Sequence, residues 1–143
     1  MSDALIMEIL HLLEENGRFT SEQIAHILGE PQEVVENILD RLYKEKVIVK
    51  HRTIIDWKKI NKTKVSALID VKVTPQHGYG FDALAKRIYH YPEVRNVYLM
   101  SGAYDLSVAL EVDSLEAVGR FVTEKLAPLD FVVSTTTHFV LKK

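Results

Sequence analysis

The sequence predicts an α+β protein, with an N-terminal winged helix-turn-helix followed by a ferredoxin-like βαββαβ domain. Two observations predict this arrangement. Apolar residues recur at helical spacing over residues 5–42, and from Val65 onward a period of two alternates with two helical stretches. The expected boundaries are 1–50 for the winged helix-turn-helix, 51–64 for a connecting strand or linker, and 65–143 for the βαββαβ domain.

Composition is that of a globular protein. The chain has 143 residues, of which 47% are apolar and 27% charged, and no cysteine. It contains no apolar run long enough to cross a bilayer, and the residues after Met1 lack the basic and apolar regions of a signal peptide. We therefore expect a cytoplasmic protein with no membrane partner.

Helix start and stop signals divide the N-terminal part. Three helices are expected, over residues 5–14, 21–28 and 31–42. Thr20 and Gln23 form a capping box for the second helix, which ends at Gly29. Pro31 is expected in the first turn of the third helix. After Lys46 the alternation of residues 47–57 predicts a strand pair or a winged extension that leads into the connector.

The C-terminal part follows the order βαββαβ. Strands are expected over residues 65–73, 94–101, 104–112 and 132–141, a turn over 75–80, and helices over 81–88 and 113–126. The second helix is expected to open at Asp113 with Glu116 in its cap. In such a unit both helices lie on one face of the sheet. The last strand carries apolar groups on both sides, so we expect the open face to pair with another copy, giving at least a dimer, with a tetramer or octamer left open.

Three helices with a short turn between the second and third are typical of a DNA-binding helix-turn-helix. Residues 1–60 hold eight Lys and Arg against eleven Asp and Glu, which disfavours nonspecific DNA binding, but the basic residues are concentrated after residue 40. The candidate contacts to double-stranded DNA are Gln32, Asn37, Arg41, Lys44, Lys50 and Arg52. The alternative is a protein-interaction module of the same fold, in which these side chains are solvated helix surface.

A second candidate site is the segment from Gly102 to Asp105. A tight turn there places a carboxylate beside exposed backbone N–H groups, an arrangement that can bind a small molecule. The candidate effector-binding residues are Gly102, Ala103, Tyr104, Asp105, Thr135 and Thr136. The alternative is an ordinary hairpin turn, in which Gly supplies a positive φ and Asp105 caps local N–H groups.

Metal and catalytic motifs are lacking. The six histidines have no metal-ligand spacing, and the sequence has neither a phosphate-binding loop nor a nucleophile elbow. We therefore expect no metal, no cofactor and no enzyme activity. One enzyme alternative stays open, because siroheme decarboxylases share a two-part architecture of this kind. His77, Arg87, His90 and Arg95 would then face the tetrapyrrole propionates.

With both parts placed, the chain resembles the Lrp/AsnC, or feast/famine, family over essentially its full length. The residues that carry the resemblance are Ile9-Leu10, Gly17-Arg18, Ile24-Ala25, Leu28-Gly29, Arg41-Leu42, Val47-Ile48, Pro92-Glu93-Val94, Gly102 with Tyr104-Asp105, Thr135-Thr136-Thr137 and Val140-Leu141. The resemblance implies a winged DNA-binding head, a sensor that pairs through its sheet, assemblies of dimers, and an amino-acid effector between sensor domains. The family usually has Gly after the third helix, where this chain has Lys46.

Overall fold

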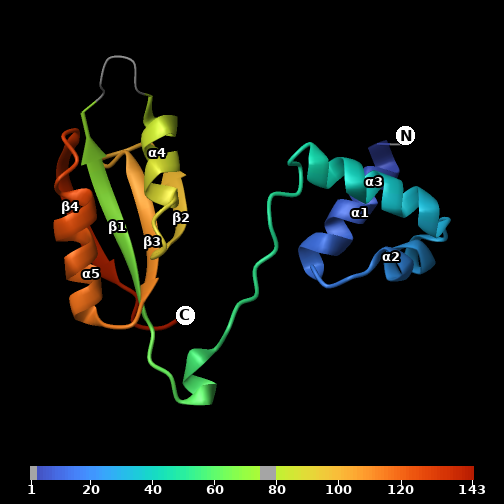
Figure 1. Cartoon of the computed structure of the whole chain (residues 1–143), viewed down its shortest axis with the longest axis horizontal. Helices are drawn as coiled ribbons and strands as arrows, with labels where there is room; N and C mark the ends of the chain where they lie inside the picture. The colour runs from blue at the N-terminus through green and yellow to red at the C-terminus, as the bar shows by residue number, and fades with distance from the viewer. Residues whose placement is uncertain (1–2, 75–79) are drawn as a thin grey trace. The chain divides into compact units, whose positions relative to one another are not determined.

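The computed structural model describes residues 3–74 and 80–143, and the chain divides into two compact units, Met1–Ile55 and Asp56–Lys143 (Figure 1). The N-terminal unit contains α1 (Asp3–Glu15), α2 (Ser21–Leu28) and α3 (Gln32–Lys44). All three expected helices form. The segment expected as a linker, 51–64, is divided between the two units.

The ends of α2 follow from its capping residues. Thr20 Oγ1 accepts a hydrogen bond from the Gln23 backbone N–H, and Gln23 Oε1 accepts one from the Thr20 N–H, so the capping box is present. Gly29 ends the helix in the left-handed region, at φ 67°. Pro31 is the N-cap of α3 rather than a residue of its first turn. The helices enclose a small core: Ile9, Ile24, Ala25, Val35, Ile38 and Leu42.

The strand pair expected after Lys46 is not formed, because residues 45–56 contain no strand. Val47 and Ile48 instead donate their N–H groups to the Leu42 carbonyl, which turns the chain back onto α3. Ile48 packs on the helical core, but Val49 is 75% exposed. The alternation that predicted a wing is thus not an alternation of buried and exposed side chains.

The C-terminal unit begins with a 3₁₀ turn, η1 (Trp57–Ile60), and then has the expected order βαββαβ. Its elements are β1 (Val65–Val73), α4 (Phe81–Tyr89), β2 (Val94–Leu99), β3 (Leu106–Val112), α5 (Leu115–Phe121), the π-helical turn η2 (Val122–Leu126) and β4 (Val132–Phe139). The strand order is β2-β3-β1-β4, and each neighbouring pair is antiparallel. This is the α+β architecture that the sequence predicts.

Several boundaries differ from the expected ones. α5 is capped by Ser114, whose Oγ accepts from the Ala117 N–H, rather than by Asp113 and Glu116. β2 ends before Met100 and β3 begins after Asp105, so the connection between them is longer than expected. The turn expected over 75–80 lies outside the described residues except for Gly80, the N-cap of α4.

The sheet has a covered face and an open face. α4 and α5 lie on the same side of the sheet (Figure 1), and the β1 residues Ala67, Ile69, Val71 and Val73 are buried on that side. Because side chains alternate along a strand, residues 66, 68, 70 and 72 belong to the other face. There Leu68 is 42% exposed. Of the described residues, none belongs to a helix long and apolar enough to span a membrane.

Candidate functional site

The connection from β2 to β3 forms a turn at the end of β1. Met100 donates to the Asp105 carbonyl (2.8 Å), and Asp105 donates to the Val71 carbonyl (3.0 Å), so both ends of the turn are fixed by backbone hydrogen bonds. Gly102 has φ 126°, a conformation that L residues rarely adopt. Residues 101–103 are exposed, and Tyr104 and Asp105 are partly buried.

Asp105 has a structural bond inside the unit. Its Oδ2 accepts a hydrogen bond from the Val73 N–H (2.9 Å), at the end of β1. Lys72 Nζ approaches the Ala103 carbonyl (3.4 Å) and places a cation beside the turn. The N–H group that Asp105 caps is thus distant in sequence, not local as in an ordinary hairpin turn.

Tyr104 connects the turn to the edge strand. Its hydroxyl is hydrogen-bonded to Thr136 Oγ1 (2.6 Å). Thr136 pairs with Asp70 and belongs to the open face, whereas Thr135 pairs with Val71 and belongs to the helix-covered face. The structure therefore brings Tyr104 and Thr136 together, with Asp105 next in the chain, and places Thr135 on the other face of the sheet.

The open face adds two polar residues that sequence reasoning did not assign to this site. His138 Nε2 lies 3.0 Å from Asp70 Oδ2, and Asp70 is opposite Thr136 in the sheet register. The alternation of β1 is the signal that places Asp70 on the uncovered face. The pairing of β1 with β4, which places His138 beside it, has no local signal in the sequence.

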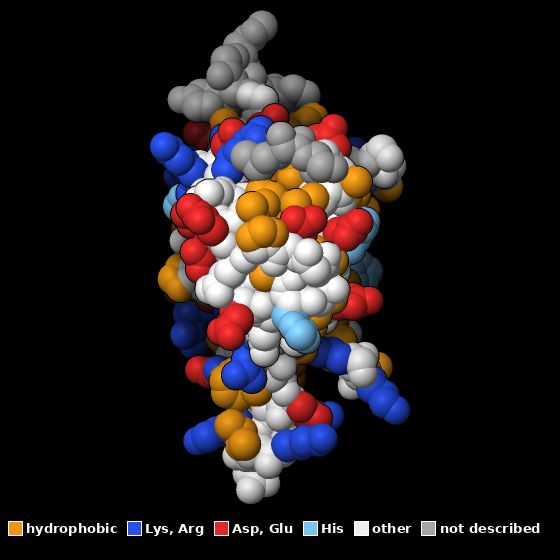
Figure 2. Space-filling view, turned by 90° about the vertical axis from the view of Figure 1, so that its right-hand side faces the viewer, with side chains coloured by type: hydrophobic (Ala, Val, Ile, Leu, Met, Phe, Trp, Pro, Cys, Tyr) orange, Lys and Arg blue, Asp and Glu red, His pale blue; other side chains and the backbone are white. Residues whose placement is uncertain are grey.

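The predicted DNA contacts on α3 are exposed, and two of them are engaged with acidic side chains. Gln32 Nε2 donates to Glu36 Oε1 (2.9 Å), and Arg41 Nε lies 3.3 Å from Glu45 Oε1. Asn37 and Lys44 are exposed on the same helix, and Lys50 and Arg52 are exposed after it. Figure 2 shows basic and acidic side chains interspersed on the face that it draws.

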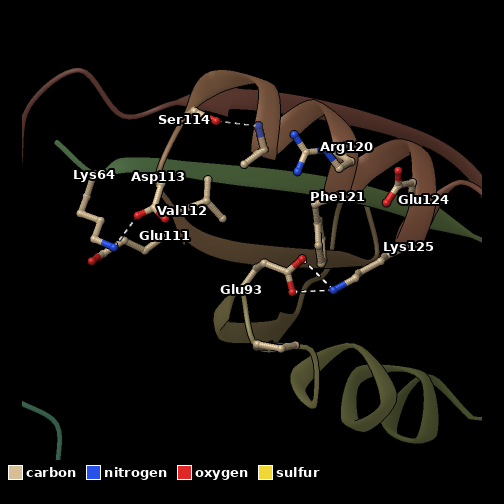
Figure 3. A pocket seen from close by; sticks show the side chains of 12 residues that line it. Lys64, Glu93, Glu111, Val112, Asp113, Ser114, Arg120, Phe121, Glu124 and Lys125 are labelled. Atoms are coloured by element: carbon tan, nitrogen blue, oxygen red, sulfur yellow. Dashed lines mark hydrogen bonds and ion pairs between the residues drawn. The ribbon is translucent and has the colours of Figure 1, made fainter.

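A charged hollow of about 420 Å³ lies between β3, α5 and the start of β2 (Figure 3). Glu93 accepts from Lys125 through both carboxylate oxygens at 2.7 Å, and Lys64 contacts Asp113 at 2.6 Å. This ion pair with Lys64 lowers the pKa of Asp113. The charges at both ends of the hollow are thus paired within the chain.

Glu111 joins this hollow to the start of the unit. Its carboxylate accepts from Trp57 Nε1 (2.9 Å) and from Lys143 Nζ (3.2 Å). Burial raises the pKa of Glu111, but hydrogen bonds from Lys143 and Trp57 and the positive charges of Lys143 and Arg95 lower it by more. The net lowering means that the folded unit favours the ionised carboxylate.

The residues proposed for a tetrapyrrole do not form a described site. His77 lies outside the described residues, and His90 Nδ1 is engaged with the Lys86 carbonyl (2.6 Å) at the end of α4. Arg87 is exposed on α4, and Arg95 is the second residue of β2. Within residues 3–74 and 80–143, no three His, Asp or Glu side chains gather as metal ligands would.

Comparison with known proteins identifies the C-terminal unit and a full-length relative. Residues 66–143 match the family described as Lrp/AsnC ligand binding domain. The chain is 55% identical over 137 residues to the uncharacterized HTH-type transcriptional regulator YugG of Bacillus subtilis, covering 95% of this chain and 82% of that protein.

Solved structures share the fold over the whole chain. A transcriptional regulator from Neisseria meningitidis in complex with L-Met superposes with a TM-score of 0.75 at 21% identity, covering 100% of this chain and 92% of that one. AsnC of E. coli superposes with a TM-score of 0.70 at 24% identity, covering 100% and 94%.

Proposed function

Because this chain belongs to the Lrp/AsnC family of transcriptional regulators, we propose that it binds duplex DNA through its N-terminal unit and an amino-acid effector through its C-terminal unit. The observation that carries the effector assignment is the turn at residues 101–104. Its backbone N–H groups have no hydrogen-bond partner among the described residues, and it is directly followed by the Asp105 carboxylate.

The turn has the groups that an amino-acid zwitterion needs. Backbone N–H groups bind a carboxylate, and Asp105, whose Oδ1 has no partner within the described chain, is an acceptor for an ammonium group. The Tyr104–Thr136 pair borders the turn on the open face. We assign five residues to the site: Gly102, Ala103, Tyr104, Asp105 and Thr136. Thr135 belongs to the helix-covered face of the sheet, so we expect it to stabilise β4 rather than to contact the ligand. The L-Met complex of the Neisseria protein supports this choice of ligand class.

In the N-terminal unit, we assign α2 and α3 as a helix-turn-helix, joined by residues 29–31. The name of the Bacillus relative supports this assignment. Gln32 and Asn37 are the candidate contacts to base edges, and Arg41, Lys44, Lys50 and Arg52 are the candidate contacts to phosphates. Glu36 Oε1 accepts hydrogen bonds from both Gln32 Nε2 and Ser21 Oγ. These two donors stabilise the carboxylate, which would otherwise be an unpaired negative charge on the helix proposed to contact DNA.

The open sheet face supports pairing between copies. Leu68 and Tyr98 are 42% and 54% exposed on or beside it, although β1 is a central strand of the sheet. Exposed apolar side chains on a sheet face that no helix covers are stabilised when a second copy covers them. A homodimer, or a tetramer or octamer built from dimers, brings two N-terminal units to one DNA duplex. Two-fold symmetry then sets half-sites about one helical turn apart.

The DNA assignment is tested on the full chain with random-sequence duplex DNA at increasing salt. We expect affinity to fall steeply with salt, and Lys44→Ala combined with Lys50→Ala to reduce the magnitude of the log–log slope by about 0.9 for each lost phosphate contact. Lys86→Ala, an exposed lysine on α4, is the matched control. Retention that does not depend on salt would instead favour the protein-interaction module.

The effector assignment is tested by thermal unfolding in the presence of each amino acid. A ligand present at a hundred times its dissociation constant stabilises the protein by about 2.7 kcal/mol. Light scattering on the same samples measures the mass of the assembly, which we expect to be an even multiple of the 16.4 kDa chain. Stabilisation by none of the amino acids would contradict the choice of effector class.

A further inference from the structure

The chain leaving α3 is fixed to the N-terminal unit although it forms no strand. Lys46 adopts a left-handed conformation (φ 61°), and this bend lets Val47 and Ile48 both donate to the Leu42 carbonyl, at 2.9 and 3.2 Å. Ile48 then packs on the helical core. These contacts hold residues 46–48 but end before Lys50.

His51 provides a second anchor, three residues farther along. Its Nε2 lies 2.6 Å from the Tyr43 hydroxyl on α3, and the two rings meet edge to face with centroids 5.8 Å apart. On its other side the ring lies against Gly17, in the turn between α1 and α2. A Cβ added at Gly17 would be 2.9 Å from His51 Nδ1 and 3.7 Å from Cε1.

Gly17 is therefore needed for space rather than for its backbone conformation. Its φ is outside the left-handed region, in contrast to Gly29 and Gly102. The nearest atoms to the added Cβ all belong to the His51 ring, so a methyl group there displaces this ring and meets no backbone. Gly17→Ala is thus a selective way to move His51.

We infer that His51 is a positioning residue for DNA binding, held between Gly17 and Tyr43 so that its neighbours Lys50 and Arg52 stay at a fixed place beside α3. This inference rests on the proposed function. An extended segment without a partner strand samples many conformations, and ordering it on DNA would oppose binding. The His51 anchor orders the segment before DNA arrives.

The test is a double-mutant cycle in the full chain. Duplex affinity is measured for His51→Ala, Gly17→Ala and the double variant, at a temperature where circular dichroism shows each of them folded. We expect each single variant to bind about fivefold more weakly, as loss of one hydrogen-bonded contact would cause. The double variant should bind no more weakly than His51→Ala, because both changes break one anchor.

Two further readouts separate positioning from contact. The salt slope should be unchanged in His51→Ala, since no phosphate contact is removed, whereas Lys50→Ala should lower it. Tyr43→Phe should weaken binding in the same direction, and His11→Ala, an exposed histidine on α1 paired with Glu14, should have no effect.

The outcomes of the cycle are distinguishable. Additive effects of Gly17→Ala and His51→Ala, or unchanged affinity in His51→Ala, would overturn the anchor while leaving DNA binding intact. A wild-type chain that does not bind duplex DNA would overturn the proposed function, and the positioning role with it.

Discussion

The polar contacts along α3 and those beside the turn between β2 and β3 form at very different sequence separations. In the N-terminal unit Gln32 meets Glu36, and Arg41 meets Glu45, each four residues away on the same helix. In the C-terminal unit Tyr104 meets Thr136, 32 residues away, through the pairing of β1 with β4. The side-chain pairs on α3 are thus set by helix periodicity, and the site proposed for the effector is set by sheet topology.

The largest expected effect is the loss of folding stability when a buried isoleucine is replaced by alanine in the core of either unit. Ile38 and Ile69 are both fully buried, but among the described residues the N-terminal core contains six buried residues and the C-terminal core fifteen. Replacing either isoleucine by alanine should cost about 2–5 kcal/mol. In the smaller unit this is a larger share of the stability, so Ile38→Ala should unfold it.

Calorimetry of the full chain measures this difference. We expect Ile38→Ala to remove the unfolding transition of the N-terminal unit, or to lower its temperature, and to leave the transition of the C-terminal unit in place. Ile69→Ala should have the opposite effect. A single transition that shifts equally in both variants would show that the two units unfold as one.

The next effect concerns Asp105, which has both a structural bond and a proposed ligand contact. Asp105→Ala leaves the Val73 N–H without its acceptor and should cost about 1–3 kcal/mol. Asp105→Asn keeps an acceptor oxygen but loses the charge, so it should cost less stability and still abolish stabilisation by the amino acid. Thermal unfolding with and without the amino acid measures both effects. Full stabilisation of Asp105→Asn by the amino acid would remove the carboxylate from the site.

The sequence predicts the order and type of nearly all elements, because capping residues and alternation are local signals. Thr20 with Gln23 and the alternation of β1 are examples. It mispredicts the wing, because residues 45–56 form no strand although Val47 and Val49 alternate with other residues. It also groups Thr135 with Thr136, although neighbouring strand residues face opposite sides of a sheet.

Other features depend on contacts that no local pattern encodes. The bond from Asp105 to Val73 and the ring of His51 against Gly17 join residues more than thirty positions apart. The local sequence around Gly17 gives no reason for a glycine without a left-handed φ. Its reason is the space for His51, which only the folded chain supplies.

The smallest expected effect concerns two bends that share a left-handed backbone conformation but have different residue types. Lys46 in the N-terminal unit and Asn61 in the C-terminal unit both adopt left-handed conformations, at φ 61° and 58°. This conformation costs most L residues about 1–2 kcal/mol, whereas Asn tolerates it. Lys46→Gly should therefore stabilise the N-terminal unit by about 0.5 kcal/mol, after the greater freedom of Gly in the unfolded chain is subtracted. Asn61→Gly, the matched control, should leave the C-terminal unit unchanged or slightly less stable. Urea unfolding of the two variants, followed separately for each unit, compares them. A loss of stability in Lys46→Gly would mean that the lysine side chain stabilises its bend by more than the strain costs.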